Sequence, residues 1–118
     1  MIKRIGLVLM LISSVMISAK ECNYDHITHE SYGHEWSVPK DCTGLNLLES
    51  GIDDKKAGKL AAALNKNETL ISLNLNDNVI GDEGAKELAA ALNKNETLTY
   101  LDLYGNYIGY EGAKELAA

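Results

Sequence analysis

The sequence has little positive charge. It contains 11 lysine and arginine residues against 17 aspartate and glutamate residues, a formal net charge of −6 at pH 7. Residues 1–19 include Lys3 and Arg4 and no acid, so residues 20–118 alone carry −8. A chain this acidic has no general attraction for nucleic-acid backbones or anionic lipid heads. The charge balance argues against nucleic-acid binding and against a membrane-surface role.

Recognisable catalytic motifs are also missing. The sequence has no Gly-x-Ser-x-Gly motif and no glycine-rich phosphate loop. With only two cysteines, a Cys–His catalytic pair has no supporting motif. Four glycines that could suggest such loops recur at a fixed interval and are explained by repeat turns: Gly81, Gly84, Gly109 and Gly112. We therefore expect no enzyme activity and no cofactor.

The long apolar run is confined to the N-terminus. Lys3-Arg4 precede a run from Ile5 to Ile17, and Ser18-Ala19 follow it. These are the three parts of a secretory signal peptide, and the run is short for a membrane span. We predict a signal peptide over residues 1–19 and an exported protein, whether secreted, periplasmic or at the cell surface. An uncleaved N-terminal anchor is the alternative.

The two cysteines, Cys22 and Cys42, both follow this segment closely. Export would place them where disulfides persist. A Cys22–Cys42 disulfide would close a loop of about 20 residues and stabilise the fold by roughly 3 kcal/mol. Alternatively, Cys42 is an unpaired, small buried residue of the first strand, because it occupies the position that Leu70 has in the next copy of the repeat described below.

The chain repeats itself at a fixed interval. Residues 67–90 return as residues 95–118, with 17 of the 24 positions identical. A more divergent copy lies one interval earlier, and residues 61–66 are identical to residues 89–94. Such a period, of about 28 residues, is typical of a stacked solenoid. We divide the chain into an N-terminal cap segment (20–41) and repeats at 42–66 (divergent), 67–94 (full) and 95–118 (truncated).

Each repeat changes its periodicity partway along. The segment from Leu70 to Ile80 alternates as an extended strand does. A turn follows, and then apolar residues at helical spacing from Ala85 to Leu92. The fold class is therefore an α/β solenoid of parallel strands inside and helices outside. We expect Leu73 and Leu101, in equivalent strands, to be fully buried.

The repeat carries a family resemblance. The pattern Leu70-x-x-Leu73-x-Leu75-x-x-Asn78-x-Ile80-Gly81 resembles leucine-rich repeats of the ribonuclease-inhibitor type. The resemblance covers residues 42–118 and implies a horseshoe whose concave strand face binds another macromolecule. It also implies that asparagines at 78 and 106 bond free backbone groups of the neighbouring turn. Ser50 replaces this asparagine in the first repeat, so we expect a looser first turn.

Sequence differences between the repeats fall partly on the predicted concave face. Ser72, Asn74 and Asn76 become tyrosine, aspartate and tyrosine, while the leucines between them stay fixed. Such an aromatic and acidic patch is suited to anchoring a protein partner. Unconstrained drift is the alternative, since positions 71, 77, 79 and 82 also differ. The candidate binding residues are Asn46, Leu48, Ser72, Asn74, Asn76, Tyr100, Asp102 and Tyr104, with Gly44 in the same columns.

The segment before the repeats is aromatic and rich in histidine. His29, Tyr32 and Trp36 follow helical spacing and align with core positions of the later helices, so we predict a cap over residues 25–37 that ends before Pro39. Three histidines and nearby acids could also bind zinc or copper, but their spacing matches no strong zinc pattern. We assign no metal ligand. A metal-binding exported protein remains an alternative function; its candidate ligands are Cys22, Asp25, His26, His29, Glu30, His34 and Glu35.

The last repeat is incomplete. Ala118 matches Ala90, so equivalents of Ala91 and Leu92 are missing. An uncapped apolar end favours self-association. A second alternative function follows: the chain is a truncated fragment with no independent function.

Overall fold

The computed structural model describes residues 19–29 and 35–118. The predicted signal peptide, except Ala19, lies outside this part of the chain, as do Glu30, Tyr32 and His34. Within the described residues no helix has the length and apolar character needed to cross a membrane.

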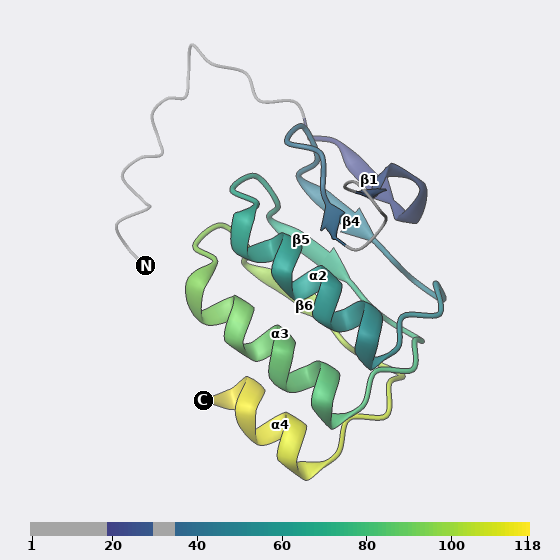
Figure 1. Ribbon diagram of the computed structural model, residues 1–118, viewed down its shortest axis with the longest axis vertical. Coiled ribbons are helices and arrows are strands. Elements are labelled where there is room, and N and C mark those ends of the chain that lie inside the picture. Colours follow the sequence, from purple (N-terminus) through teal and green to yellow (C-terminus); the bar gives the residue numbers. More distant parts are fainter. Residues whose placement is uncertain (1–18, 30–34) are drawn as a thin grey trace.

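The molecule has a layer of short parallel strands and a layer of helices (Figure 1). The strands lie in the order β1 (Glu21–Asn23), β4 (Gly44–Asn46), β5 (Ser72–Asn74) and β6 (Tyr100–Asp102). The helices α2 (Asp54–Lys66), α3 (Asp82–Lys94) and α4 (Tyr110–Ala117) each follow one strand. This arrangement is the predicted α/β solenoid, with one strand and one helix per repeat.

The core lies between the two layers. Leu45, Leu73 and Leu101 are paired across β4, β5 and β6, because each repeat returns the chain to the same register. The sequence prediction is confirmed for Leu73, which has no exposed surface, but is wrong for Leu101, which is only partly buried. Nothing in the described chain packs on the outer side of β6 and α4. The fully buried leucines and isoleucines are Leu45, Leu47, Ile52, Leu60, Leu64, Leu70, Leu73, Leu75, Ile80 and Leu88.

The repeated asparagines connect adjacent turns, as the family resemblance implies. The side chain of Asn78 accepts hydrogen bonds from the backbone N–H groups of Ser50 and Ile52, each 2.9 Å long. It donates to the carbonyl oxygen of Leu47, also at 2.9 Å. Asn106 repeats the pattern by accepting from the N–H of Ile80 at 3.0 Å. These side chains satisfy backbone groups that would otherwise be buried without a partner.

A second set of contacts between repeats uses aspartate. Oδ1 of Asp54, the first residue of α2, accepts from the N–H groups of Gly81 (2.6 Å) and Gly84 (3.1 Å) at the start of α3. Asp82 makes the same two bonds, 2.6 and 3.0 Å long, at the start of α4. A Cβ atom on Gly84 would lie 2.7 Å from Oδ1 of Asp54, so the position requires glycine because of this close approach. Each helix therefore supplies the N-terminal cap of the next.

The cap segment differs from its predicted form. It contains β1, a short 3-10 helix (η1, Tyr24–His26) and an antiparallel strand pair, β2 (Thr28–His29) with β3 (Trp36–Ser37). The helical spacing of His29 and Trp36 was misleading, because both residues are in strands and pair directly with each other. Trp36 is nonetheless buried, as a cap residue should be, whereas His29 is exposed.

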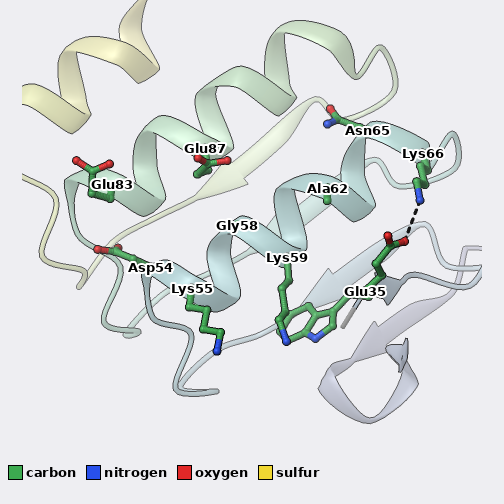
Figure 2. A pocket seen from close by; sticks show the side chains of 11 residues that line it. Glu35, Asp54, Lys55, Gly58, Lys59, Ala62, Asn65, Lys66, Glu83 and Glu87 are labelled. Carbon is green, nitrogen blue, oxygen red and sulfur yellow. Dashed lines mark hydrogen bonds and ion pairs between the residues drawn. The ribbon is translucent and has the colours of Figure 1, made fainter. Parts of the chain in front are cut away.

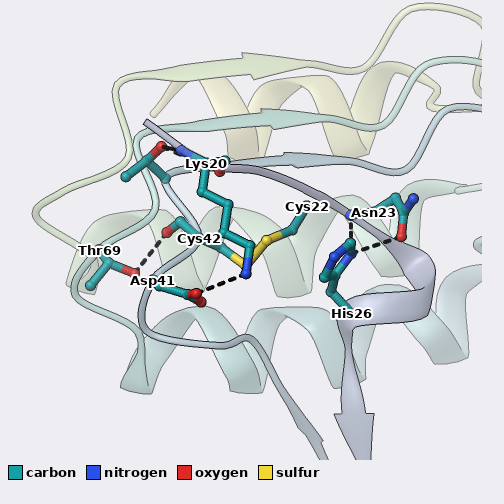
Figure 3. Close-up of polar contacts among 8 residues, drawn as sticks. Lys20, Cys22, Asn23, His26, Asp41, Cys42 and Thr69 are labelled. Atoms are coloured by element: carbon teal, nitrogen blue, oxygen red, sulfur yellow. Dashed lines mark hydrogen bonds and ion pairs between the residues drawn. A yellow bond between two sulfur atoms is a disulfide. The ribbon is translucent and has the colours of Figure 1, made fainter. Parts of the chain in front are cut away.

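The cap is joined covalently to the repeats. Cys22 in β1 forms a disulfide with Cys42, and their Cα atoms are 5.8 Å apart (Figure 3). Both residues are buried. Nζ of Lys20 lies 2.7 Å from a carboxylate oxygen of Asp41 beside the disulfide, and this lysine holds the pKa of Asp41 below its ordinary value. Thr69 donates to the carbonyl of Cys42 at 2.9 Å, so the second repeat also contacts this region.

Candidate functional site: the concave strand face

The sheet surface away from the helices has three columns of side chains. The strand register aligns Glu21 with Gly44, Ser72 and Tyr100, and aligns Asn23 with Asn46, Asn74 and Asp102. A third column follows the strands and contains Leu48, Asn76 and Tyr104. Successive side chains of a strand point to opposite faces, so the buried leucines between these residues place all three columns on one surface. The structure therefore brings the eight predicted binding residues onto one face.

Two tyrosines of this concave face are exposed to solvent. Tyr100 is 56% exposed and Tyr104 is 77% exposed. The hydroxyl of Tyr100 donates to Asp102 at 3.2 Å, which raises the pKa of the phenol. The patch presents two rings beside one carboxylate. Such groups can provide apolar contact, hydrogen bonds and a negative charge to a partner.

The middle column also has a structural role. Oδ1 of Asn74 accepts from the N–H of Asn76 at 2.9 Å, and Asn46 does the same for Leu48 at 3.1 Å. Asp102 accepts from the N–H of Tyr104 at 3.1 Å, and this hydrogen bond is the main reason why the pKa of Asp102 is lowered. These side chains fix the turn after each strand. They can offer a partner only the polar groups that these bonds leave available.

Sequence reasoning missed two residues of the face, Glu21 and Asn23. Both belong to β1, in a cap that does not share the period of the repeats, so no repeat pattern pointed to them. The carboxylate of Glu21 lies over Gly44, where it would contact a Cβ atom on that glycine. The only available signal was Cys22: if this cysteine faces the core, its neighbours in a strand must face outwards.

A hollow lies on the opposite, helical side of the molecule (Figure 2). It has a volume of about 750 Å³ and lies between α2, α3 and the cap, with an ion pair of 3.2 Å between Lys66 and Glu35 at one end. Opposite charges line its two sides. Lys55 and Lys59 are on α2, and Glu83 and Glu87 are on α3. We read it as a solvated groove between charged helices. It provides control positions for tests of the concave face.

The described histidines are both engaged within the cap. Nδ1 of His26 accepts from the N–H of Asn23 at 3.1 Å (Figure 3). The His29 ring packs edge-on against Trp36, with centroids 6.1 Å apart. Because Cys22 is in the disulfide, it has no free thiolate to bind a metal. In residues 19–29 and 35–118, no three histidine, cysteine or acidic residues are grouped as a metal site would require.

Comparison with known proteins agrees with this geometry. The leucine-rich-repeat family profile matches residues 66–89 and 94–117. Among solved structures, the chain is similar to leiomodin-1 actin-binding site 2, with 31% sequence identity and a TM-score of 0.60. That match covers 66% of this chain and 46% of the leiomodin chain, less than half of its length. No curated protein matches the sequence significantly.

These observations define the class of protein. The chain is a leucine-rich-repeat protein of the ribonuclease-inhibitor-like type. Its repeats form a generic protein-interaction module of a kind that is typically not catalytic.

Proposed function

We propose that this protein is a non-enzymatic interaction module that binds a protein partner through its concave strand face. The observation that carries the proposal is the exposure of Tyr100 in β6 and of Tyr104 in the turn after it, beside Asp102. Tyrosine has few rotatable bonds and so loses little entropy when it binds, and it is a common anchor at protein interfaces. The similar leiomodin-1 structure is an actin-binding site, which supports protein binding by such a module.

The side chains of the face support a binding role more than a catalytic one. They are amides, hydroxyls, aromatic rings and carboxylates. Neither described histidine belongs to the three strand columns: His26 is bonded to Asn23 at the cap end, and His29 packs against Trp36. No histidine therefore stands beside the hydroxyl groups of the three columns to act as their base.

We also propose that the protein works outside the cytoplasm. The Cys22–Cys42 disulfide supports this location, because such bonds persist in oxidising compartments. The signal-peptide pattern of residues 1–19 points the same way. Mass spectrometry of exported protein should show cleavage after Ala19 and a mass lower than that of the dithiol by two hydrogen atoms. An intact N-terminus or two free thiols in that material would contradict the proposal.

The binding face can be tested with two tyrosine pairs. In a pull-down with the disulfide-bonded chain, Tyr100→Ala with Tyr104→Ala should weaken partner binding by about 2 kcal/mol or more, roughly 30-fold. The matched control is Tyr107→Ala with Tyr110→Ala. Those tyrosines are 74% and 76% exposed, and they belong to the same repeat but lie outside the strand face.

Two outcomes would contradict the concave-face proposal. One is equal loss of binding with both tyrosine pairs. The other is loss with Lys86→Ala and Glu87→Ala on α3 while the Tyr100 and Tyr104 pair has no effect.

A further inference from the structure

The charge on the concave face has one sign. Its three strand columns contain Glu21 and Asp102, and no lysine or arginine stands at these strand positions. The nearest base along the chain, Lys20, is already paired with Asp41 at 2.7 Å. Roughly 14 Å separates the strand of Glu21 from that of Asp102, since three strand spacings lie between them. The face is thus acidic at both ends.

A hollow accompanies the acid at the cap end. It has a volume of about 410 Å³ and is lined by Glu21, Thr43, Gly44, Ile71 and Ser72, together with Ala19 and Lys20. It exists because the column between Glu21 and Tyr100 is filled only by a glycine and a serine. At the place where a Cβ atom on Gly44 would lie, the Ser72 hydroxyl is 3.0 Å away and the Glu21 carboxylate is closer still. Small residues therefore leave a shallow hollow beside the Glu21 carboxylate and the Ser72 hydroxyl.

The chemistry of this hollow fits a long basic side chain. Ile71 is 49% exposed at its edge and offers apolar surface to an aliphatic stem. The carboxylate of Glu21 can accept hydrogen bonds from an ammonium or a guanidinium group, and the Ser72 hydroxyl can accept another. Among the described residues the Glu21 side chain forms no ion pair. The backbone nitrogen of Lys20, which becomes the N-terminal ammonium in a chain cleaved after Ala19, donates to the Thr43 hydroxyl at 2.9 Å and not to Glu21.

We propose that the partner is a basic protein segment, and that one of its lysine or arginine side chains enters this hollow and pairs with Glu21. The inference rests on the proposed function and specifies the partner's chemistry. Tyr100 and Asp102, across the sheet, provide an aromatic and acidic position for a second cation. The acidic face also attracts a basic segment before contact.

The test uses a defined probe and the disulfide-bonded chain. The probe is a capped peptide of three Gly-Arg units, and its matched control has citrulline, which keeps the shape of arginine without the charge. We expect the arginine peptide to shift the amide NMR signals of Glu21, Gly44 and Ser72. We expect at least tenfold weaker binding of the citrulline peptide, and weaker binding of the arginine peptide as salt is raised.

Two variants locate the contact. Glu21→Gln removes the charge without changing the shape and should weaken binding of the arginine peptide at least threefold. Ser72→Tyr fills the hollow with the residue that the next repeat carries in the same column, so the strand accommodates it, and it should weaken binding about tenfold. Glu87→Gln, on the helical side, should leave binding unchanged.

Several outcomes would overturn the inference: no binding of the arginine peptide, equal binding of both peptides, or shifts confined to α2 and α3. Concave-face shifts that depend only on protein concentration would identify a second copy as the occupant and would also reject it. The proposed function fails separately. If Tyr100→Ala with Tyr104→Ala abolishes partner binding while Glu21→Gln and Ser72→Tyr do not weaken it, the concave face binds a partner. In that case the partner does not place a basic side chain beside Glu21.

Discussion

The second and third repeats have nearly the same sequence but different environments. They are identical at 17 of 24 aligned positions. In the second repeat Leu73 and Ala85 are fully buried. Their counterparts in the third repeat, Leu101 and Ala113, are partly buried and exposed respectively. The difference arises because α3 and β5 have neighbours on both sides, whereas within the described residues α4 and β6 have a neighbour on one side only.

The comparison separates two kinds of information in the sequence. The pattern of leucines specifies the strand and helix of each repeat, whichever position the repeat occupies. Burial depends on the neighbouring repeats, because one unit cannot bury its apolar face alone. Equivalent substitutions in the two repeats should therefore have unequal effects.

The largest difference is expected for the strand leucines. Leu73→Ala should destabilise the fold by about 2–5 kcal/mol, because it leaves a cavity in the centre of the core. Leu101→Ala should cost clearly less, because its site is already partly open to water. Denaturant unfolding followed by helical circular dichroism measures both. An unchanged unfolding midpoint for Leu73→Ala would mean that the strand register is wrong. Equal losses of stability in the two variants would contradict the burial argument.

The next largest effect concerns the disulfide-bonded cap end. Replacing Cys22 and Cys42 with alanine should lower the free energy of unfolding by roughly 3 kcal/mol. Chemical unfolding of the double variant against the oxidised chain gives this value. A matched control is the oxidised chain measured with and without a reductant, since reduction should reproduce the loss. A variant as stable as the oxidised chain would show that the bond adds nothing to the stability of the repeats.

The repeats and the cap differ in how much of their structure could be predicted from the sequence. Periodicity predicted the solenoid, the strands around Leu73 and Leu101, and the helix that ends at Lys94. It also placed the candidate tyrosines on one face. It failed in the cap, where His29 and Trp36 follow helical spacing by coincidence and belong to a strand pair. A segment that occurs once has no internal copy against which its spacing can be checked.

Contacts between repeats were only partly predictable. The role of Asn78 followed from the family resemblance, but that of Asp82 did not. The structure shows that it caps the following helix, α4. The available signal was Asp54 in the same column of the previous repeat. Its partner groups are backbone N–H groups 27 and 30 residues away, which periodicity within one repeat does not reveal.

The aspartate caps give the third comparison. Asp54→Ala leaves two N–H groups of α3 without their acceptor and should destabilise the fold by about 1–2 kcal/mol. Asp82→Ala removes the same bonds from α4, and this shorter terminal helix is less strongly coupled to the core, so we expect a smaller loss. Asp54→Asn keeps an acceptor oxygen and should recover part of the stability. Thermal unfolding of the three variants checks the order, and an Asp82→Ala effect above that of Asp54→Ala would contradict it.

The smallest effect concerns the charge that distinguishes Asp102 from Asn74 in the same column. The hydrogen bond from the N–H of Tyr104 holds the pKa of Asp102 below its ordinary value of 3.8. Ionised Asp102 therefore adds stability above that value, and the contribution is lost as the pH falls through the lower pKa of the folded state. Asp102→Asn gives the third repeat the residue that the second repeat has at this position, Asn74. The side-chain oxygen of Asn74 accepts the equivalent hydrogen bond, from the N–H of Asn76, at 2.9 Å. We expect a slightly lower thermal midpoint than the parent chain at neutral pH and a difference that shrinks as the solution becomes acidic. The measurement is a series of thermal scans of both proteins across the acid range. A difference that stays constant, or that grows towards acid pH, would show that the Asp102 charge does not stabilise this turn.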